Sequence, residues 1–289
     1  MTQVRWPFVL LAAVLTLISP FLAALRLKIL FSRVYSLPLK FTWAVGYIAA
    51  LVSLALPFYV GGFGSAYILS KKARVSYSKS FAILFVDFLF GVFLTIILGT
   101  IGIYYFYQKR LLTPRLEDWR WIVVFCFTLI VAIFALLILK SKHKKIENLF
   151  LKLKDFSSIV SSIIIIKAFL LTVLVAVLGF GASYLYFIAF GLKPPITDFI
   201  LASSLFGLLG LIPGAPGKIG QYETFGVITL PFLLGLDKNR VFVTLLINHT
   251  FSVTAIVIFG LISLHLLNLN FSKIETLLGL KRNRQISKY

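Results

Sequence analysis

Cysteine and acidic residues are scarce in this sequence. Of 289 residues, one is a cysteine, Cys126, and 9 are Asp or Glu, against 29 Lys and Arg. A single cysteine excludes a disulfide within the chain and a metal site built from several cysteines. The three histidines, His143, His249 and His265, are too scattered to suggest a zinc triad. We therefore expect neither a bound metal nor a cofactor.

The motifs of the common enzyme classes are also missing. The sequence has no HExxH, no GxSxG, no Walker A lysine motif and no GxGxxG before a Rossmann-type helix. These absences favour a transporter-like protein over an enzyme, and we assign no catalytic residue.

Long apolar runs are abundant. The chain is 60% hydrophobic and its mean hydropathy is +1.00. Crossing a bilayer of roughly 30 Å takes about 20 apolar residues per helix. The runs lack the alternation of a membrane β-barrel, so helices must satisfy their backbone groups. The sequence predicts an all-α integral membrane protein with a single polytopic domain over residues 1–289.

The positive charge lies in the gaps between the apolar runs. In a membrane protein, a net charge of +20 placed in this way marks cytoplasmic loops and contact with anionic lipid headgroups, and we expect no nucleic-acid partner. Residues 140–155, with six lysines against two acids, should be cytoplasmic, as should the basic tail 268–289. The N-terminus should lie outside the cell, because the residues that follow the first apolar run are more basic than those that precede it. We expect the plasma membrane as the location.

The runs predict about six full transmembrane helices plus two re-entrant or broken helical elements. Residues 26–40 mix basic and apolar side chains, which is typical of a short interfacial helix. Residues 108–120 should form an external loop. The clearest full spans are residues 6–25, 81–107, 121–139, 159–190 and 241–267.

Proline and glycine interrupt two apolar stretches. One contains PFYVGGFGS, residues 57–65, between two basic segments, so it should enter and leave the membrane on the same side. The other is LIPGAPGKIGQYETF, residues 211–225, between runs 199–212 and 225–236, which are too short to span. Non-helical backbone at membrane depth is tolerated only inside protein or beside a water-filled cavity.

The two breaks share a spacing of proline and glycine. It occurs at Pro57, Gly61 and Gly64 and again at Pro213, Gly217 and Gly220. Matching helix breaks in two halves indicate an inverted-repeat transporter with its site near the membrane midplane. The repeat halves would be residues 1–107 and 159–267, linked by residues 108–158.

The second break is a candidate anion site. A helix that starts near Glu223 presents unpaired backbone N–H groups, and its dipole favours an anion. Gly217 and Gly220 let the backbone approach a ligand, and Lys218 adds a positive charge. A lipid phosphate fits these features. Alternatively, Lys218 snorkels to the interface, and Glu223 caps the helix, pairs with Lys218 or carries a proton.

Polar residues within the predicted spans are further candidates, because a charge inside a bilayer is costly. Asp87 lies early in one span, and Asn248 and His249 lie early in the last. An inverted arrangement would bring Asp87 and His249 to a hydrated cavity shared with Glu223. Alternatively, Asp87 is an interfacial acid near Lys79, and His249 is a core histidine bonded to a carbonyl. The candidate substrate-binding or transport residues are Pro216, Gly217, Lys218, Gly220, Glu223, Asp87, Asn248, His249, Gly61, Gly62 and Gly64.

The stretch PGKIGQYE, residues 216–223, resembles the P-G-G-L-G-x-x-E signature of the lysylphosphatidylglycerol synthase transmembrane region, also called the flippase-like domain family. Gly260 in the last span is similar to a glycine of this family. The resemblance implies an integral membrane protein that moves or handles lipids. Some members flip aminoacylated phosphatidylglycerol or related glycolipids.

The chain departs from the family pattern at several positions. Gly62 and Ser65 stand where the first break usually has Glu and Arg. Asp87 and Phe88 replace an E-R pair, and His249 replaces an arginine. No soluble aminoacyl-transferase domain follows the membrane part, so we do not expect lysyl transfer.

The sequence therefore favours a lipid flippase or lipid transporter for the phosphate-bearing headgroup of a phospholipid, aminoacyl-lipid or glycolipid. Its partners would be membrane lipids, anionic or phosphate-bearing. Two alternatives stay open. One is an intramembrane lipid-linked transferase that uses Glu223 or Asp87 as a base, and the other is a non-catalytic membrane partner of a separate transferase.

Overall fold

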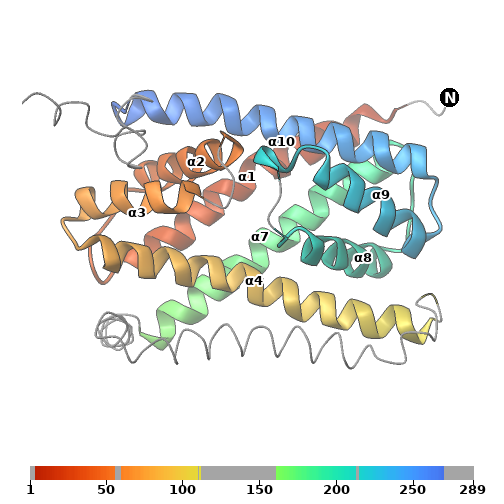
Figure 1. The fold of residues 1–289 in the computed structure, drawn as a ribbon, viewed down its shortest axis with the longest axis horizontal. Helices are drawn as coiled ribbons and strands as arrows, with labels where there is room; N and C mark the ends of the chain where they lie inside the picture. The colour runs from red at the N-terminus through yellow and green to blue at the C-terminus, as the bar shows by residue number, and fades with distance from the viewer. Residues whose placement is uncertain (1–3, 56–59, 110, 112–160, 213–214, 270–289) are drawn as a thin grey trace, which may run out of the picture.

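The structure is a computed structural model that describes residues 4–55, 60–109, 111, 161–212 and 215–269. Over these residues every regular element is helical: eight α-helices and one short 3-10 helix. Figure 1 shows them as an elongated bundle. The prediction of an all-α membrane fold is confirmed.

Among the described residues, four helices are long and apolar enough to cross a membrane. The shortest has 26 residues and is about 39 Å long at 1.5 Å per residue, more than the roughly 30 Å of a hydrocarbon core. Large apolar side chains such as Leu10, Val14 and Phe21 lie exposed along it, as expected of a surface that faces lipid. The four are α1 (Trp6–Phe31), α4 (Tyr77–Gln108), α7 (Ser162–Ala189) and α10 (Lys238–Leu266).

These helices confirm four of the predicted spans. The fifth, residues 121–139, lies outside the described residues, as do the loop 140–155 and nearly all of residues 108–120 and 268–289. The prediction of an interfacial helix over residues 26–40 is wrong, because α1 continues unbroken to Phe31. Leu27, Leu30 and Phe31 are buried there, so this last turn is packed into the core of the bundle.

Two pairs of short helices form hairpins between the long ones. The first pair is α2 (Leu39–Ala55) and α3 (Val60–Ala73), and the second is α8 (Ile196–Leu209) and α9 (Gln221–Leu234). In Figure 1 the first pair lies toward one end of the bundle and the second toward the other. The 3-10 turn η3 (Pro216–Lys218) at the second tip contacts α2. Helices of 14 to 17 residues cannot span, which confirms two broken elements.

Each hairpin packs against a long helix of the other half of the chain. Helix α8 lies on α4, and α2 lies on α10. Glycines make both contacts close, since a Cβ at Gly99 would collide with Leu208 and a Cβ at Gly260 would collide with Leu51. At the end of α4, Lys109 donates a 2.7 Å hydrogen bond to Asp198 of α8, and this bond raises the pKa of Lys109.

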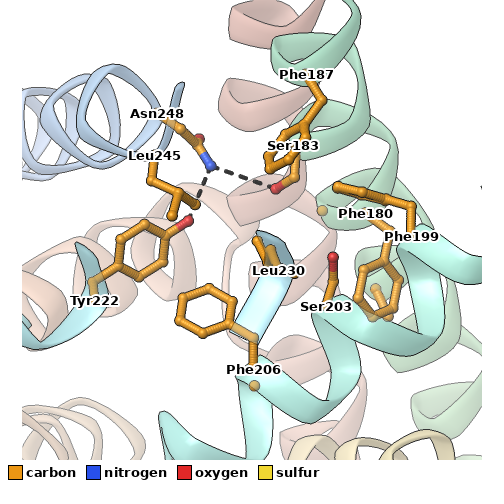
Figure 2. A pocket seen from close by; sticks show the side chains of 13 residues that line it. Phe180, Ser183, Phe187, Phe199, Ser203, Phe206, Tyr222, Leu230, Leu245 and Asn248 are labelled. Atoms are coloured by element: carbon orange, nitrogen blue, oxygen red, sulfur yellow. Dashed lines mark hydrogen bonds between the residues drawn. The ribbon is translucent and has the colours of Figure 1, made fainter. Parts of the chain in front are cut away.

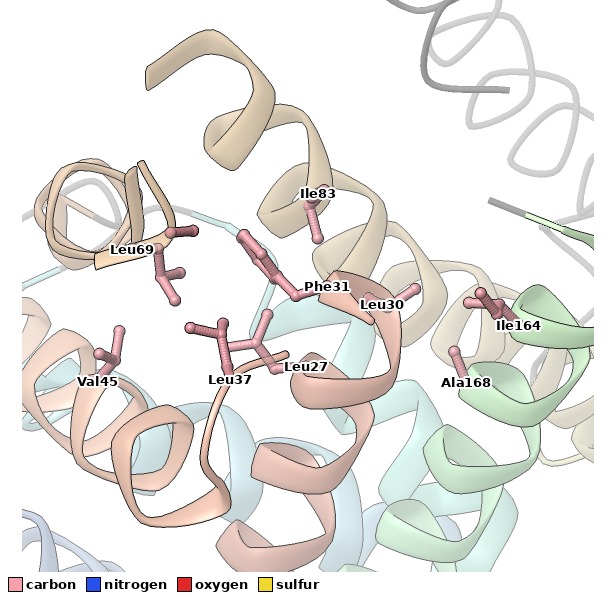
Figure 3. Packing of buried hydrophobic residues seen from close by; sticks show 10 residues of the cluster. Leu27, Leu30, Phe31, Leu37, Val45, Leu69, Ile83, Ile164 and Ala168 are labelled. Atoms are coloured by element: carbon pink, nitrogen blue, oxygen red, sulfur yellow. The ribbon is translucent and has the colours of Figure 1, made fainter. Parts of the chain in front are cut away.

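Buried apolar side chains form one cluster around each hairpin. The first joins α1, α2, α3, α4 and α7 (Figure 3). The second joins α4, α7, α8, α9 and α10 and is rich in phenylalanine. Members of the first include Leu27, Leu30, Phe31, Leu37, Val45, Leu69 and Ile83, and members of the second include Phe106, Phe187, Phe199, Leu230, Val241 and Leu245.

Candidate functional site

The tip of the second hairpin is a connector, residues 215–220, whose backbone is partly left-handed. Gly217 has φ 63°, Lys218 has φ 57° and Gly220 has φ 78°. Glycine adopts this conformation without steric cost, whereas a lysine pays for it. The connector turns the chain from α8 into α9 and directs the Gly217 carbonyl toward α10.

Glu223 and His249 form an ion-pair contact at this tip. Oε1 of Glu223 lies 2.6 Å from Nδ1 of His249, and Oε2 accepts a 2.9 Å hydrogen bond from the Gly220 N–H. The carboxylate therefore caps α9, one of the predicted alternatives, while it also contacts α10. Nε2 of His249 lies 3.1 Å from the Gly217 carbonyl oxygen. His249 is thus bonded to a carbonyl, as predicted for a core histidine, and to a carboxylate as well.

Lys218 belongs to the neighbouring helix end. Its Nζ donates a 2.6 Å hydrogen bond to the carbonyl oxygen of Gly210, the residue that ends α8. A cation at a helix C-terminus is favoured by the dipole. Two groups of the predicted anion site are thus engaged within the protein in this structure: the Gly220 N–H is bonded to Glu223, and the Lys218 ammonium to the end of α8. Pro216 begins the 3-10 turn beside it.

A neutral polar network continues from His249. The ring of Tyr222 lies against the His249 ring, with centroids 4.6 Å apart. Asn248 donates through Nδ2 to the Tyr222 hydroxyl at 3.1 Å and to the Ser183 hydroxyl of α7 at 3.5 Å. Sequence reasoning missed Tyr222 and Ser183. Their signals were a tyrosine directly before Glu223 and a serine within an apolar run.

This network forms one wall of an open cavity of about 320 Å³ lined by α7, α8, α9 and α10. Figure 2 shows the Asn248 amide directed toward Tyr222 and Ser183 at its edge. Phenylalanines and small residues make up much of the rest of the wall, with the hydroxyl of Ser203 on α8. Among the residues that line the cavity, none is charged. The main aromatic members are Phe180, Phe187, Phe199 and Phe206.

Asp87 has a different partner. Its two oxygens accept hydrogen bonds of 2.6 and 3.0 Å from Arg26 of α1, and Arg26 also donates a 3.0 Å bond to Thr172 of α7. The Arg26 and Asp87 side chains are 12% and 20% exposed. Asp87 is therefore neutralised within the bundle and not by Lys79. The structure brings Glu223 and His249 together, and a hydrated cavity that also includes Asp87 stays a prediction.

The glycines of the first break lie within α3, not in a connector. A Cβ at Gly61 would collide with the Ala49 carbonyl, so Gly61 allows α2 and α3 to approach. Gly62 has open space beside it, and Gly64 lies about one helical turn after Gly61. The close packing of α2 on α3 is sufficient to explain why residue 61 is a glycine.

Residues of the two halves can be compared by their positions counted from the start of each helix. Asp87 is the eleventh residue of α4 and Asn248 the eleventh of α10. In the same way, Leu27 of α1 corresponds to Ser183 of α7, and Leu69 of α3 to Leu230 of α9. Leu27 and Leu69 belong to the apolar cluster of Figure 3. Ser183 thus has an apolar core residue, Leu27, at the same helix position in the first half, and Asn248 has the ion-paired Asp87.

The chain was compared with known proteins. The family model described as "Lysylphosphatidylglycerol synthase TM region" matches residues 1–260. The chain belongs to this family. Within the lysylphosphatidylglycerol synthase TM region, the stretch resembling the signature corresponds to η3 and the first turn of α9, where Glu223 caps the helix.

One curated relative is an archaeal membrane protein. The UPF0104 membrane protein MJ1078 of Methanocaldococcus jannaschii is 24% identical over 230 residues, which cover 77% of this chain and 96% of the relative. No solved structure matched the chain. The long helices and this family together support an integral membrane protein.

Proposed function

We propose that this protein is a lipid transporter of the flippase type, which moves the headgroup of a phosphate-bearing membrane lipid between leaflets. The observation that carries the proposal is the cavity beside the second hairpin, with Asn248, Tyr222 and Ser183 on its wall. Polar groups inside a membrane bundle are costly and mark substrate pathways. A partly polar cavity among spanning helices suits a headgroup whose acyl chains stay in lipid.

The arrangement of the hairpins supports transport. Both halves have the helix order long, short, short, long, and each hairpin packs on the last helix of the other half. We propose that residues 1–107 and 159–267 are an inverted repeat. Broken helices that meet at the midplane are the usual binding elements of inverted-repeat transporters, in which one unit moves against the other.

A phosphate would have to compete for groups that are engaged in this conformation. Lys218 would exchange the Gly210 carbonyl for a phosphate oxygen. The Gly220 N–H would likewise exchange the Glu223 carboxylate for a phosphate oxygen. Both contacts belong to the left-handed connector, so one rearrangement there would free a cation and a backbone donor together. We propose that the connector adopts this second arrangement during transport.

Transferase chemistry has less support. A catalytic base needs a lone pair that can reach a substrate proton. Both oxygens of Asp87 are bonded to Arg26, both oxygens of Glu223 are bonded, and both ring nitrogens of His249 contact protein oxygens. These groups are arranged for holding helices together.

Reconstitution tests the proposal. Purified protein in phosphatidylcholine vesicles with a trace of fluorescent phosphatidylglycerol should accelerate the loss of inner-leaflet label to external dithionite, and mass spectrometry should find the lipid unchanged. Asn248→Leu, which removes the polar wall, should slow exchange strongly. Asp198→Asn, at the far end of α8, should leave it unchanged. No exchange by wild-type protein would reject the proposal, and a new covalent lipid product would favour a transferase.

Orientation follows separately. We propose a plasma-membrane location with the N-terminus outside and the C-terminus in the cytoplasm, since the most basic segments flank the predicted inner ends.

A further inference from the structure

His249 has hydrogen-bond acceptors on both sides of its ring. Nδ1 lies 2.6 Å from Oε1 of Glu223, and Nε2 lies 3.1 Å from the carbonyl oxygen of Gly217. A carbonyl oxygen only accepts, so Nε2 carries a hydrogen. The contact between Nδ1 and the carboxylate oxygen needs a second proton, on one atom or the other. The Glu223–His249 pair therefore binds one proton more than a carboxylate beside a neutral imidazole.

This proton keeps the pair electrically neutral. An imidazolium beside a carboxylate and a neutral imidazole beside a carboxylic acid both have zero net charge. Charge within a membrane bundle is costly, and Glu223 is a buried side chain. Without the proton, one ring nitrogen must turn a lone pair toward an acceptor, either Nδ1 toward the Glu223 oxygen at 2.6 Å or Nε2 toward the Gly217 oxygen at 3.1 Å, and this is repulsive. Loss of the proton must therefore break one of these two contacts.

Breaking either contact would loosen the attachment of α10 to the tip of the second hairpin. Gly217 and Gly220 lie in the connector, and each is bonded to one member of the pair. The connector also contacts α2, where Leu54 lies against Gly217. The bonds that depend on this proton thus join α10 to the connector, and the connector is the part of the second hairpin that contacts the first.

The Arg26–Asp87 pair provides a contrast. An arginine stays charged at all accessible pH values, so this pair is neutral without a titrating proton. It joins α1 to α4 at a depth along α4 that matches Asn248 along α10. The long helices α1 and α4 are therefore joined by a fixed ion pair, whereas α9 and α10 are joined by a proton-dependent one.

The surroundings contain further titratable groups. Tyr222 of α9 stacks on the His249 ring, and Lys218 of the connector is bonded to Gly210. On the other elements packed around α9 and α10, the described groups within the bundle are Arg26 of α1, Tyr47 of α2, Tyr184 and Tyr186 of α7, and Asp198 of α8. Arg26 is bonded to Asp87, so it does not supply the counter-charge for Glu223, and Asp198 is itself an acid, bonded to Lys109.

We infer that the Glu223–His249 pair is a proton-binding site, and that loading and unloading its proton couples lipid movement to a proton gradient. The inference rests on the proposed lipid transport for the coupling, but not for the proton site. Binding the proton fixes the connector to α10, and releasing it frees the connector for the rearrangement that exposes Lys218.

Nuclear magnetic resonance tests the proton site. Replacing His143 and His265 by glutamine leaves His249 as the one histidine, whose nitrogen-15 shifts report each ring nitrogen. These shifts, read together with the carbon-13 shift of the Glu223 carboxyl, should locate the second proton, either on the His249 ring or on Glu223. In Glu223→Gln the amide can donate to Nδ1, so the second proton should be absent. A singly protonated His249 beside an ionised Glu223 in the otherwise native protein overturns the proton site.

Vesicles test the coupling. A pH gradient across vesicles of phosphatidylcholine with fluorescent phosphatidylglycerol should change the initial exchange rate several-fold, and reversing the gradient should reverse the change. Glu223→Gln and His249→Gln should abolish this response, whereas Asp198→Asn should keep it. Wild-type exchange that ignores the gradient overturns the coupling and leaves the proposed function intact. Absence of exchange with or without a gradient rejects both, whatever the histidine spectrum shows.

Discussion

The guanidinium of Arg26 and the carboxylate of Asp87 form a bidentate ion pair between α1 and α4. Both side chains are mostly buried, and Thr172 of α7 completes the hydrogen bonding of Arg26. One residue from each of three long helices therefore meets at this point.

Breaking this pair should destabilise the fold. Removing one partner leaves a buried charge, so Arg26→Met or Asp87→Leu alone should lower the free energy of unfolding by about 3 kcal/mol. The double variant, which removes both charges, should be close to wild type. Thermal unfolding in detergent measures all three. Equal loss in the single and double variants would mean that the pair does not act as a unit.

Gly99 should tolerate no side chain. A Cβ there collides with Leu208, so Gly99→Ala should cost about 1 to 3 kcal/mol through overpacking. Leu208→Ala in the same chain should recover part of that loss, because the two residues are in contact. Gly46→Ala is the matched control, since a Cβ at Gly46 meets nothing within 4 Å. Unfolding curves that show equal effects at Gly99 and Gly46 would contradict the packing.

Filling the cavity should block transport without unfolding the protein. Gly179 lines the cavity, and a Cβ there has open space around it. Gly179→Leu should therefore occupy the volume of a headgroup and reduce lipid exchange at least tenfold. Gly46→Leu places the same side chain on an exposed position of α2 and should leave exchange intact. Normal exchange by Gly179→Leu would exclude this cavity from the transport path.

Lys218 should stabilise the protein through its charged side chain, although its left-handed backbone conformation costs free energy. The hydrogen bond to Gly210 is charge-assisted, so Lys218→Ala should cost roughly 1.5 to 3 kcal/mol in stability. Lys218→Gly loses the same bond but relieves the left-handed conformation, and should be more stable than Lys218→Ala by about 1 kcal/mol. Both should weaken retention of phosphatidylglycerol during purification, measured by lipid mass spectrometry. Unchanged lipid retention would leave Lys218 with a structural role.

Topology can be tested with single cysteines. In a Cys126→Ser background, cysteines at His143 and Thr113 should react with an impermeant reagent from opposite sides of the membrane. The expectation follows from the basic segment around His143. Reaction of both from one side would reverse the assignment of these loops.

The sequence predicted the elements of this fold better than their contacts. Runs of apolar residues located the long helices, and the half-helices were too short to be anything but broken elements. Arg26 was misjudged because charge alone does not tell whether a basic residue at a helix end faces a headgroup or a buried carboxylate. Asp87, the residue that decides this, is far along the chain.

The candidate site was predicted in part. Glu223 and His249 were both named, since each is a costly group within an apolar segment, and the structure places them in contact. Ser183 and the cavity could not be predicted, because a lone serine in a membrane helix commonly bonds to its own backbone. What made it part of a site is the position of Asn248, which depends on how α7 packs near α10.

The crossed packing of the hairpins has a consequence for biosynthesis. Helix α2 lies on α10, which begins at Lys238 and leaves the ribosome long after α2 has entered the membrane. Until α10 is inserted, Leu51 has no Gly260 to pack against, and the surface of α2 that contacts α10 stays uncovered. Nascent chains truncated before α10 should therefore be targets for membrane proteases, and resistance to digestion should arise only when the last helix has been inserted.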